Sequence, residues 1–142
     1  MLIANPVTLG DKLRNRRLEL GLSQSQVAKI FNTDSDLVYM WEKNLVKPTV
    51  KRFPQVIDFL GYFPFDINQD SIGGKIKKYR YAHGLSQEKM ANFLDIDECT
   101  VSNYESGKRT LSRKKQDIIV AQLIPKKLNS YNLIRGSRQI KE

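Results

Sequence analysis

Several residue types that build common functional sites are scarce in this 142-residue chain. It has one cysteine, Cys99, and one histidine, His83. These counts exclude an intrachain disulfide and any zinc site built from several cysteines or histidines. No apolar run approaches the roughly 20 residues of a membrane-spanning helix, and the first residues lack the charged start and long apolar core of a signal peptide. We therefore expect a soluble, cytoplasmic protein with no membrane partner, no metal and no other cofactor.

The sequence motifs that mark enzymes are missing as well. There is no phosphate-cradling glycine-rich loop and no nucleophile paired with a histidine or an acid. We therefore expect that the chain is not an enzyme.

Basic residues are abundant, and their position along the chain is informative. The net charge is +9. Residues 1–70 hold nine basic and eight acidic residues, and residues 71–107 hold five of each. Residues 108–142 hold ten basic and two acidic residues. This C-terminal excess predicts an arm that binds phosphate groups; the alternative is a solubilising tail.

The chain contains an internal repeat. Residues 9–48 align without a gap with residues 72–111, and eleven of the 40 positions are identical. An ungapped repeat of this length indicates one structural unit used twice. The identical pairs are Gly10/Gly73, Lys12/Lys75, Arg17/Arg80, Gly21/Gly84, Leu22/Leu85, Ser23/Ser86, Gln24/Gln87, Ala28/Ala91, Asp34/Asp97, Val38/Val101 and Glu42/Glu105.

Capping residues and apolar spacing predict four or five short helices in each unit. The first runs to Leu20 and stops at Gly21. The second starts at Ser23, where Gln26 completes a capping box. The third runs from Ser35 to about residue 43 after an Asp34 cap, and the fourth covers roughly residues 52–60. Asn32, Asp95, Asn44 and Gly107 fall where left-handed backbone is needed.

This pattern predicts an all-α fold of two tandem four-to-five-helix bundles, each containing a helix-turn-helix. Ala28 and Ala91 would let the second and third helices approach closely. We expect a first domain over residues 1–61, a packed apolar connector over 62–71, a second domain over 72–124 and a basic tail over 125–142. The connector's aromatic residues are expected to pack between the repeats and fix their orientation.

Two strings carry a family resemblance. They are Leu13-Arg14-x-x-Arg17-x-x-x-Gly21-Leu22-Ser23-Gln24 and Ile76-Lys77-x-x-Arg80-x-x-x-Gly84-Leu85-Ser86-Gln87, and each repeat closes with an aromatic-acid pair, Trp41-Glu42 or Tyr104-Glu105. Together they resemble the phage repressor/Cro-like (xenobiotic-response-element type) helix-turn-helix family. The resemblance implies five-helix domains that bind operator DNA through the third helix, usually as repressors working in pairs.

The resemblance also implies site residues. Gln24 and Gln87 would donate to phosphate and brace the reading helix. Arg17–Glu42 and Arg80–Glu105 would form partly buried ion pairs; direct DNA contact is the alternative for these four residues. Base-reading positions would be Ser35, Asp36, Tyr39 and Met40 in the first repeat, and Glu98, Cys99, Ser102 and Asn103 in the second. Family members often carry Gln or Ser at the first two of these positions, and this chain departs from that with Asp36 and Glu98.

Side-chain spacing separates core aromatics from candidate DNA contacts. Trp41 and Tyr104 follow Val38 and Val101 at core spacing, whereas Tyr39 lies on the opposite, exposed side. We expect further phosphate contacts from a set of basic residues beside the reading helices: Lys43, Lys108, Arg109, Arg113, Lys114 and Lys115.

The sequence thus predicts a transcriptional regulator, a repressor, that binds double-stranded DNA in the nucleoid. Because the two sets of reading residues differ, we expect a non-palindromic site. The chain could also pair with a second copy of itself. The alternative is a protein-interaction adaptor, antitoxin-like or contacting polymerase, with mainly non-specific affinity for DNA.

Overall fold

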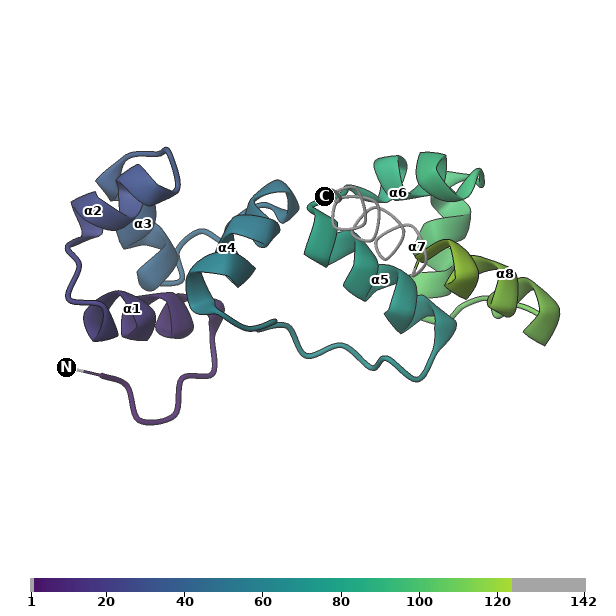
Figure 1. Ribbon diagram of the computed structural model, residues 1–142, viewed down its shortest axis with the longest axis horizontal. Coiled ribbons are helices and arrows are strands. Elements are labelled where there is room, and N and C mark those ends of the chain that lie inside the picture. Colours follow the sequence, from purple (N-terminus) through teal and green to yellow (C-terminus); the bar gives the residue numbers. More distant parts are fainter. Residues whose placement is uncertain (1, 124–142) are drawn as a thin grey trace, which may run out of the picture. The chain divides into compact units, whose positions relative to one another are not determined.

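The computed structural model describes residues 2–123, and within them every regular element is a helix. Figure 1 shows the elements in chain order. They are α1 (Leu9–Glu19), α2 (Gln24–Ile30), α3 (Ser35–Glu42), a short 3-10 turn η1 (Val50–Arg52), α4 (Phe53–Leu60), α5 (Ile72–His83), α6 (Gln87–Leu94), α7 (Glu98–Ser106) and α8 (Arg113–Leu123). The all-α prediction is therefore confirmed.

The helices are grouped in two compact units. The first unit comprises the described chain up to Asp66 together with Tyr81–Gly84, and the second comprises Ile67–Arg80 and the described chain from Leu85. The expected connector 62–71 is thus shared, since its residues up to Asp66 belong to the first unit. The expected basic tail, 125–142, lies outside the described residues.

Local chemistry sets the helix ends where the sequence places them. Ser23 and Gln26 form the predicted capping box at the start of α2, and the Asp34 side chain accepts from the Leu37 amide at the start of α3. Asn32 and Asp95 both adopt left-handed backbone, with φ of 55° and 59°. Each unit therefore turns sharply between its second and third helices at the same point.

The first unit has an aromatic core beneath α3. Phe31 packs edge-on against Trp41 and Phe59, with ring centroids 5.4 and 5.5 Å apart. Leu13, Val27, Ala28, Val38, Val56 and Leu60 complete the buried cluster. Edge-to-face aromatic pairs add to the free energy gained from burial, and Trp41 is a core residue as predicted.

The second unit replaces these aromatics with smaller or more polar residues. Its core is formed by Ile72, Ile76, Met90, Ala91, Leu94, Val101 and Ile119, with Tyr104 packed partly buried against it. The repeat alignment places Leu94 at the position of Phe31, and the same offset continued beyond the alignment places Gln122 at the position of Phe59. A stacked Tyr79–Phe93 pair, with centroids 5.3 Å apart, adds aromatic packing at a different place.

A glycine in each unit allows the first helix to approach the end of the third. A Cβ atom on Gly10 would overlap the main-chain oxygen of Trp41, and a Cβ on Gly73 would overlap that of Tyr104. Both glycines are buried. Both repeats therefore have glycine at this position because the first and third helices pack closely there. This contact helps to position the third helix of each unit.

The connector packs onto the first unit through its aromatic residues. Phe65 lies 4.4 Å from Phe53 of α4 and 5.2 Å from Phe63, measured between ring centroids. The Lys12 ammonium donates to the Pro64 carbonyl over 3.0 Å. These contacts hold residues 63–65 on the α1–α4 side of the unit, and the role of the connector in orienting the units stays a prediction.

Candidate nucleic-acid interface

Helices α2 and α3 form a helix-turn-helix, and α6 and α7 form a second one (Figure 1). In the first turn the Thr33 amide donates to the Ala28 carbonyl over 2.8 Å. In the second turn the Ile96 amide donates to the Ala91 carbonyl over 3.0 Å. Ala28 and Ala91 are both buried, at 2% and 3% exposure, as expected for residues between closely packed helices.

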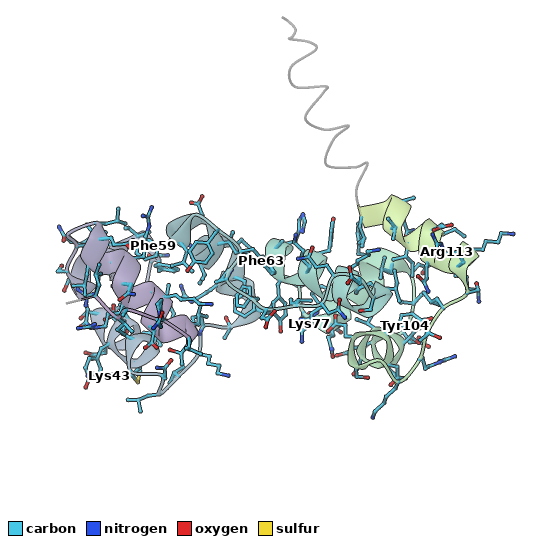
Figure 2. The ribbon with its side chains drawn as sticks, turned by 90° about the horizontal axis from the view of Figure 1, so that it is seen from below. Lys43, Phe59, Phe63, Lys77, Tyr104 and Arg113 are labelled. Carbon is cyan, nitrogen blue, oxygen red and sulfur yellow. The ribbon has the colours of Figure 1, made fainter. Side chains whose placement is uncertain are left out.

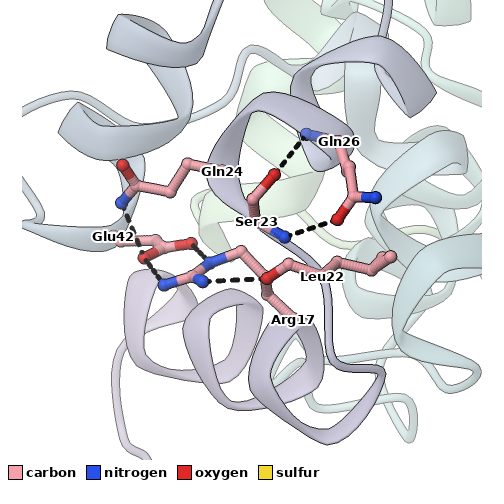
Figure 3. A network of polar contacts seen from close by, with 6 residues as sticks. All are labelled: Arg17, Leu22, Ser23, Gln24, Gln26 and Glu42. Atoms are coloured by element: carbon pink, nitrogen blue, oxygen red, sulfur yellow. Dashed lines mark hydrogen bonds and ion pairs between the residues drawn. The ribbon is translucent and has the colours of Figure 1, made fainter.

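A buried polar network ties α1, α2 and α3 of the first unit together, and Figure 3 shows it from close by. Arg17 Nε lies 2.6 Å from Glu42 Oε2, and Arg17 Nη2 lies 2.9 Å from Glu42 Oε1. Arg17 Nη1 also donates to the Leu22 carbonyl over 3.1 Å. The guanidinium thus bonds α3 at two points and the loop before α2 at a third, which fixes the start of α2 against the end of α3.

Gln24 belongs to the same network. Its amide nitrogen donates to Glu42 Oε1 over 3.1 Å, so Glu42 accepts from both Arg17 and Gln24. The bracing expected of Gln24 is therefore present. One amide hydrogen and the side-chain oxygen remain for other contacts, and a phosphate contact by Gln24 stays a prediction.

The second unit repeats this network atom for atom. Arg80 Nε and Nη2 lie 2.8 and 2.9 Å from the two carboxylate oxygens of Glu105. Arg80 Nη1 donates to the Leu85 carbonyl over 3.2 Å, and the Gln87 amide donates to Glu105 Oε1 over 3.3 Å. Both ion pairs named from the sequence are thus formed.

The Arg17–Glu42 pair is largely withdrawn from water, with side-chain exposures of 13% and 4%. The hydrogen bond to Glu42 is the main factor that raises the pKa of Arg17 above its usual value. Two parallel bonds between a guanidinium and a carboxylate fix the orientation of both groups. The pair therefore works as a rigid strut that sets the angle of α3.

The expected base-reading residues of the first unit lie along α3. Asp36 and Tyr39 are exposed, and Ser35 and Met40 are half-buried. The Lys43 ammonium lies 5.8 Å from the centroid of the Tyr39 ring, one turn away. This face thus combines an acid, a phenol and a lysine around an apolar methionine.

The expected base-reading residues of the second unit lie along α7. Glu98 and Cys99 are exposed, and Ser102 and Asn103 are half-buried. The Asn103 side-chain amide donates to Cys99 Sγ over 3.7 Å, a weak hydrogen bond because sulfur is a weak acceptor. The two helices present different chemistry at all four matched positions.

The basic residues expected to contact phosphate occupy exposed positions after the reading helices and at the start of α8. Lys43 caps α3, whereas Lys108 and Arg109 follow α7 and three further basic residues begin α8: Arg113, Lys114 and Lys115. Figure 2 labels Lys43 and Arg113 at the surfaces of their own units. Arg113 Nε lies 3.5 Å from Asp117, but both side chains are largely exposed, at 89% and 70%, so this pair contributes little.

The sequence reasoning missed the role of Arg52. Its Nη1 donates to the Phe31 carbonyl over 2.8 Å, and its guanidinium lies over the Trp41 ring, 5.5 Å from the centroid. Arg52 thus caps α2, because Phe31 is the C-cap residue of that helix. Comparison of the two repeats could not have revealed this role, because the matched residue, Lys115, has an exposed side chain.

Comparison with known proteins agrees with this geometry. A family model described as helix-turn-helix matches the chain twice, over residues 13–67 and 76–115. The chain belongs to the helix-turn-helix family. The two matched segments contain the two ion-pair networks, so the family pattern covers both units.

A relative in Aeropyrum pernix, named as a candidate HTH-type transcriptional regulatory protein, is 35% identical over 51 residues. The alignment covers 36% of this chain and 16% of the relative, so this protein spans only a small part of that protein's length. No solved structure matches the chain. In the described part of the chain, no helix is both long and apolar enough to cross a membrane.

Proposed function

We propose that this protein is a transcriptional regulator that binds double-stranded DNA sequence-specifically, through α3 and α7 as two non-identical reading helices. One observation carries the proposal: the same buried strut braces both helices, while the four matched reading positions differ in each pair. In a helix-turn-helix the second helix enters the major groove and its first residues contact base edges. A shared scaffold with different reading residues suits a non-palindromic site.

The side chains on offer support particular base contacts. Carboxylates such as Asp36 and Glu98 accept from the amino group of cytosine, and an amide such as Asn103 can bond adenine through two atoms. Tyr39 can contact a thymine methyl group or a phosphate. Each good bidentate contact discriminates against the wrong base by about 1–3 kcal/mol.

Selection from a random 30-base-pair library tests the proposal. We expect an asymmetric motif, bound at least about 10³-fold more tightly than random DNA. Asp36→Gln and Glu98→Gln should each change the preferred base in a different half of the motif, because Gln pairs with adenine instead of cytosine. A library without enrichment would contradict sequence-specific reading.

We further propose that the protein represses transcription, because a protein seated in the groove beside a promoter blocks polymerase. A template carrying the selected motif at its promoter should yield less transcript in vitro as the protein is added. A scrambled motif is the matched control, and increased transcription would contradict repression.

A second candidate function is that of a protein-interaction adaptor. The exposed carboxylates of Asp36 and Glu98 favour it, because they lie at the reading faces and repel phosphate. Under this alternative the Gln substitutions leave base preference unchanged. DNA binding would then be non-specific, steeply dependent on salt and lost on deletion of residues 125–142.

A further inference from the structure

The segment that follows each reading helix begins with the same turn in both units but carries different side chains. We name residues 43–52 the first flank and residues 106–115 the second flank. Asn44 and Gly107 both adopt left-handed backbone, with φ of 61° and 80°. The Val46 amide donates to the Met40 carbonyl over 3.4 Å, and the matched Arg109 amide donates to the Asn103 carbonyl over 3.2 Å. The two flanks therefore begin with the same turn.

The side chains at the tip of this turn have opposite character. The first flank exposes Leu45 and Val46, at 68% and 41%. The second flank exposes Lys108 and Arg109 at the same positions, and neither has an ion-pair partner among the described residues. A cation at this tip can form an ion pair with a phosphate, whereas an apolar side chain cannot.

The two flanks also differ at their far ends. Arg52 of the first flank is turned inward onto the Phe31 carbonyl and the Trp41 ring, whereas its counterpart Lys115 is exposed, as are Lys114 and Arg113 before it. The first flank is left with three exposed cations, Lys43, Lys47 and Lys51, and the second with five. Arg52 is used to support the fold and is unavailable for binding.

The length of the reading helices places these flanks beside the DNA backbone. A helix of eight or nine residues is about 12–14 Å long, and the major groove is about 12 Å wide. With the first residues of the helix at the base edges, its C-terminal end reaches the wall of the groove, where the phosphates lie. In this docking the turn tips at 45–46 and 108–109 would lie beside the phosphates.

We propose that the two units hold DNA unequally: the second unit is the backbone anchor, through its cationic flank, and the first unit adds discrimination more than affinity. This inference rests on the proposed function. The anchor binds first, and the covalent link then raises the effective concentration of the first unit at the neighbouring groove. DNA association therefore depends on salt mainly through the second unit.

Reciprocal exchange between the flanks tests the inference in the full chain. One variant, Lys108→Leu with Arg109→Val, gives the second flank the residues of the first. The other, Lys43→Ser with Lys47→Thr, gives the first flank the residues of the second. Each exchange removes two charges, and every new residue already occupies the matched position in the other unit.

Affinity for the selected duplex is measured by fluorescence anisotropy between about 50 and 200 mM salt, the range over which phosphate contacts dominate. We expect the second-flank exchange to lower the slope of log K against log salt by about two and to weaken binding at physiological salt by about tenfold to thirtyfold. The first-flank exchange should lower the slope by less than about one. Equal losses, or a larger loss from the first flank, would overturn the proposal.

Two further arms keep the outcomes distinct. The apolar exchange could unfold the second unit, which a loss of helical signal would show. In that case the variant Lys108→Gln with Arg109→Gln removes the same two charges and introduces polar side chains. Leu45→Lys with Val46→Arg should steepen the salt slope, because it gives the first unit an anchor. The unmodified protein tests the proposed function separately. Equal losses from the two exchanges on a specific duplex overturn only the inference. Absence of sequence preference overturns the function and with it the discriminating role of the first unit, and absence of DNA binding overturns both proposals entirely.

Discussion

Arg17 and Glu42 form a two-point ion pair, Nε to Oε2 at 2.6 Å and Nη2 to Oε1 at 2.9 Å, that joins the first helix of the first unit to the end of its reading helix. Arg80 and Glu105 form the same pair in the second unit. The pair makes the angle of the reading helix depend on α1, a helix distant in sequence. We therefore expect changes at these residues to affect both stability and DNA binding.

We predict that Arg17→Ala unfolds the first unit, because it leaves Glu42 as a buried carboxylate without its cationic partner. Breaking a buried pair from one side costs about 3–5 kcal/mol. The fluorescence of Trp41, the single tryptophan, reports on the first unit during urea unfolding. Arg113→Ala is the matched control, since its pair is exposed. An Arg17→Ala variant with unchanged unfolding and lost DNA affinity would instead assign Arg17 a direct DNA contact.

We predict that Gly10→Ala destabilises the first unit by about 1–3 kcal/mol, as over-packing does in a close-packed interior. Its added Cβ would overlap the Trp41 carbonyl oxygen, so α1 and α3 would have to separate. Trp41 fluorescence measures the effect. Ser25→Ala, at an exposed helix position, should leave the midpoint nearly unchanged, and an equally small effect of Gly10→Ala would show that the helices can move apart freely.

We predict that Phe59→Ala costs the first unit about 3–5 kcal/mol, because Phe59 is 8% exposed and packs edge-on against Phe31. The second unit has Gln122 at the matched position and should be unaffected. The unfolding transition seen by Trp41 fluorescence would then move to lower urea, while part of the helical signal at 222 nm persists to higher urea. Ile30→Ala, at a 53% exposed position, is the control. A single shared transition would show that the two units unfold together.

The second unit should lose stability in alkaline solution through Tyr79. Burial raises the pKa of Tyr79 above its usual 10.0. The unfolded chain therefore ionises first, so the stabilisation is present below about pH 10 and is lost as the pH rises through the folded-state pKa. Urea unfolding followed by helicity at about pH 9 and pH 11 measures the loss, and Tyr79→Phe should reduce it. An identical pH response in that variant would place the effect elsewhere.

Much of the fold is determined by interactions between residues that are close together in the sequence. The capping box of Ser23 and Gln26, the Asp34 cap and the left-handed turns at Asn32 and Asp95 depend on chemistry within four residues, so the sequence predicted them correctly. The expected ends of α1 and α3 were one residue too long, because the last turn of a helix depends on contacts as well as on propensity.

The sequence by itself determined that one helix-turn-helix unit is used twice, because periodicity and capping are local properties and recur in both repeats. Only the tertiary structure decided which contacts the long side chains make. Arg52 turns inward onto Phe31, whereas the matched Lys115 stays exposed. Sequence position cannot determine this choice, because a partner 21 residues away comes within reach only when the helices have packed.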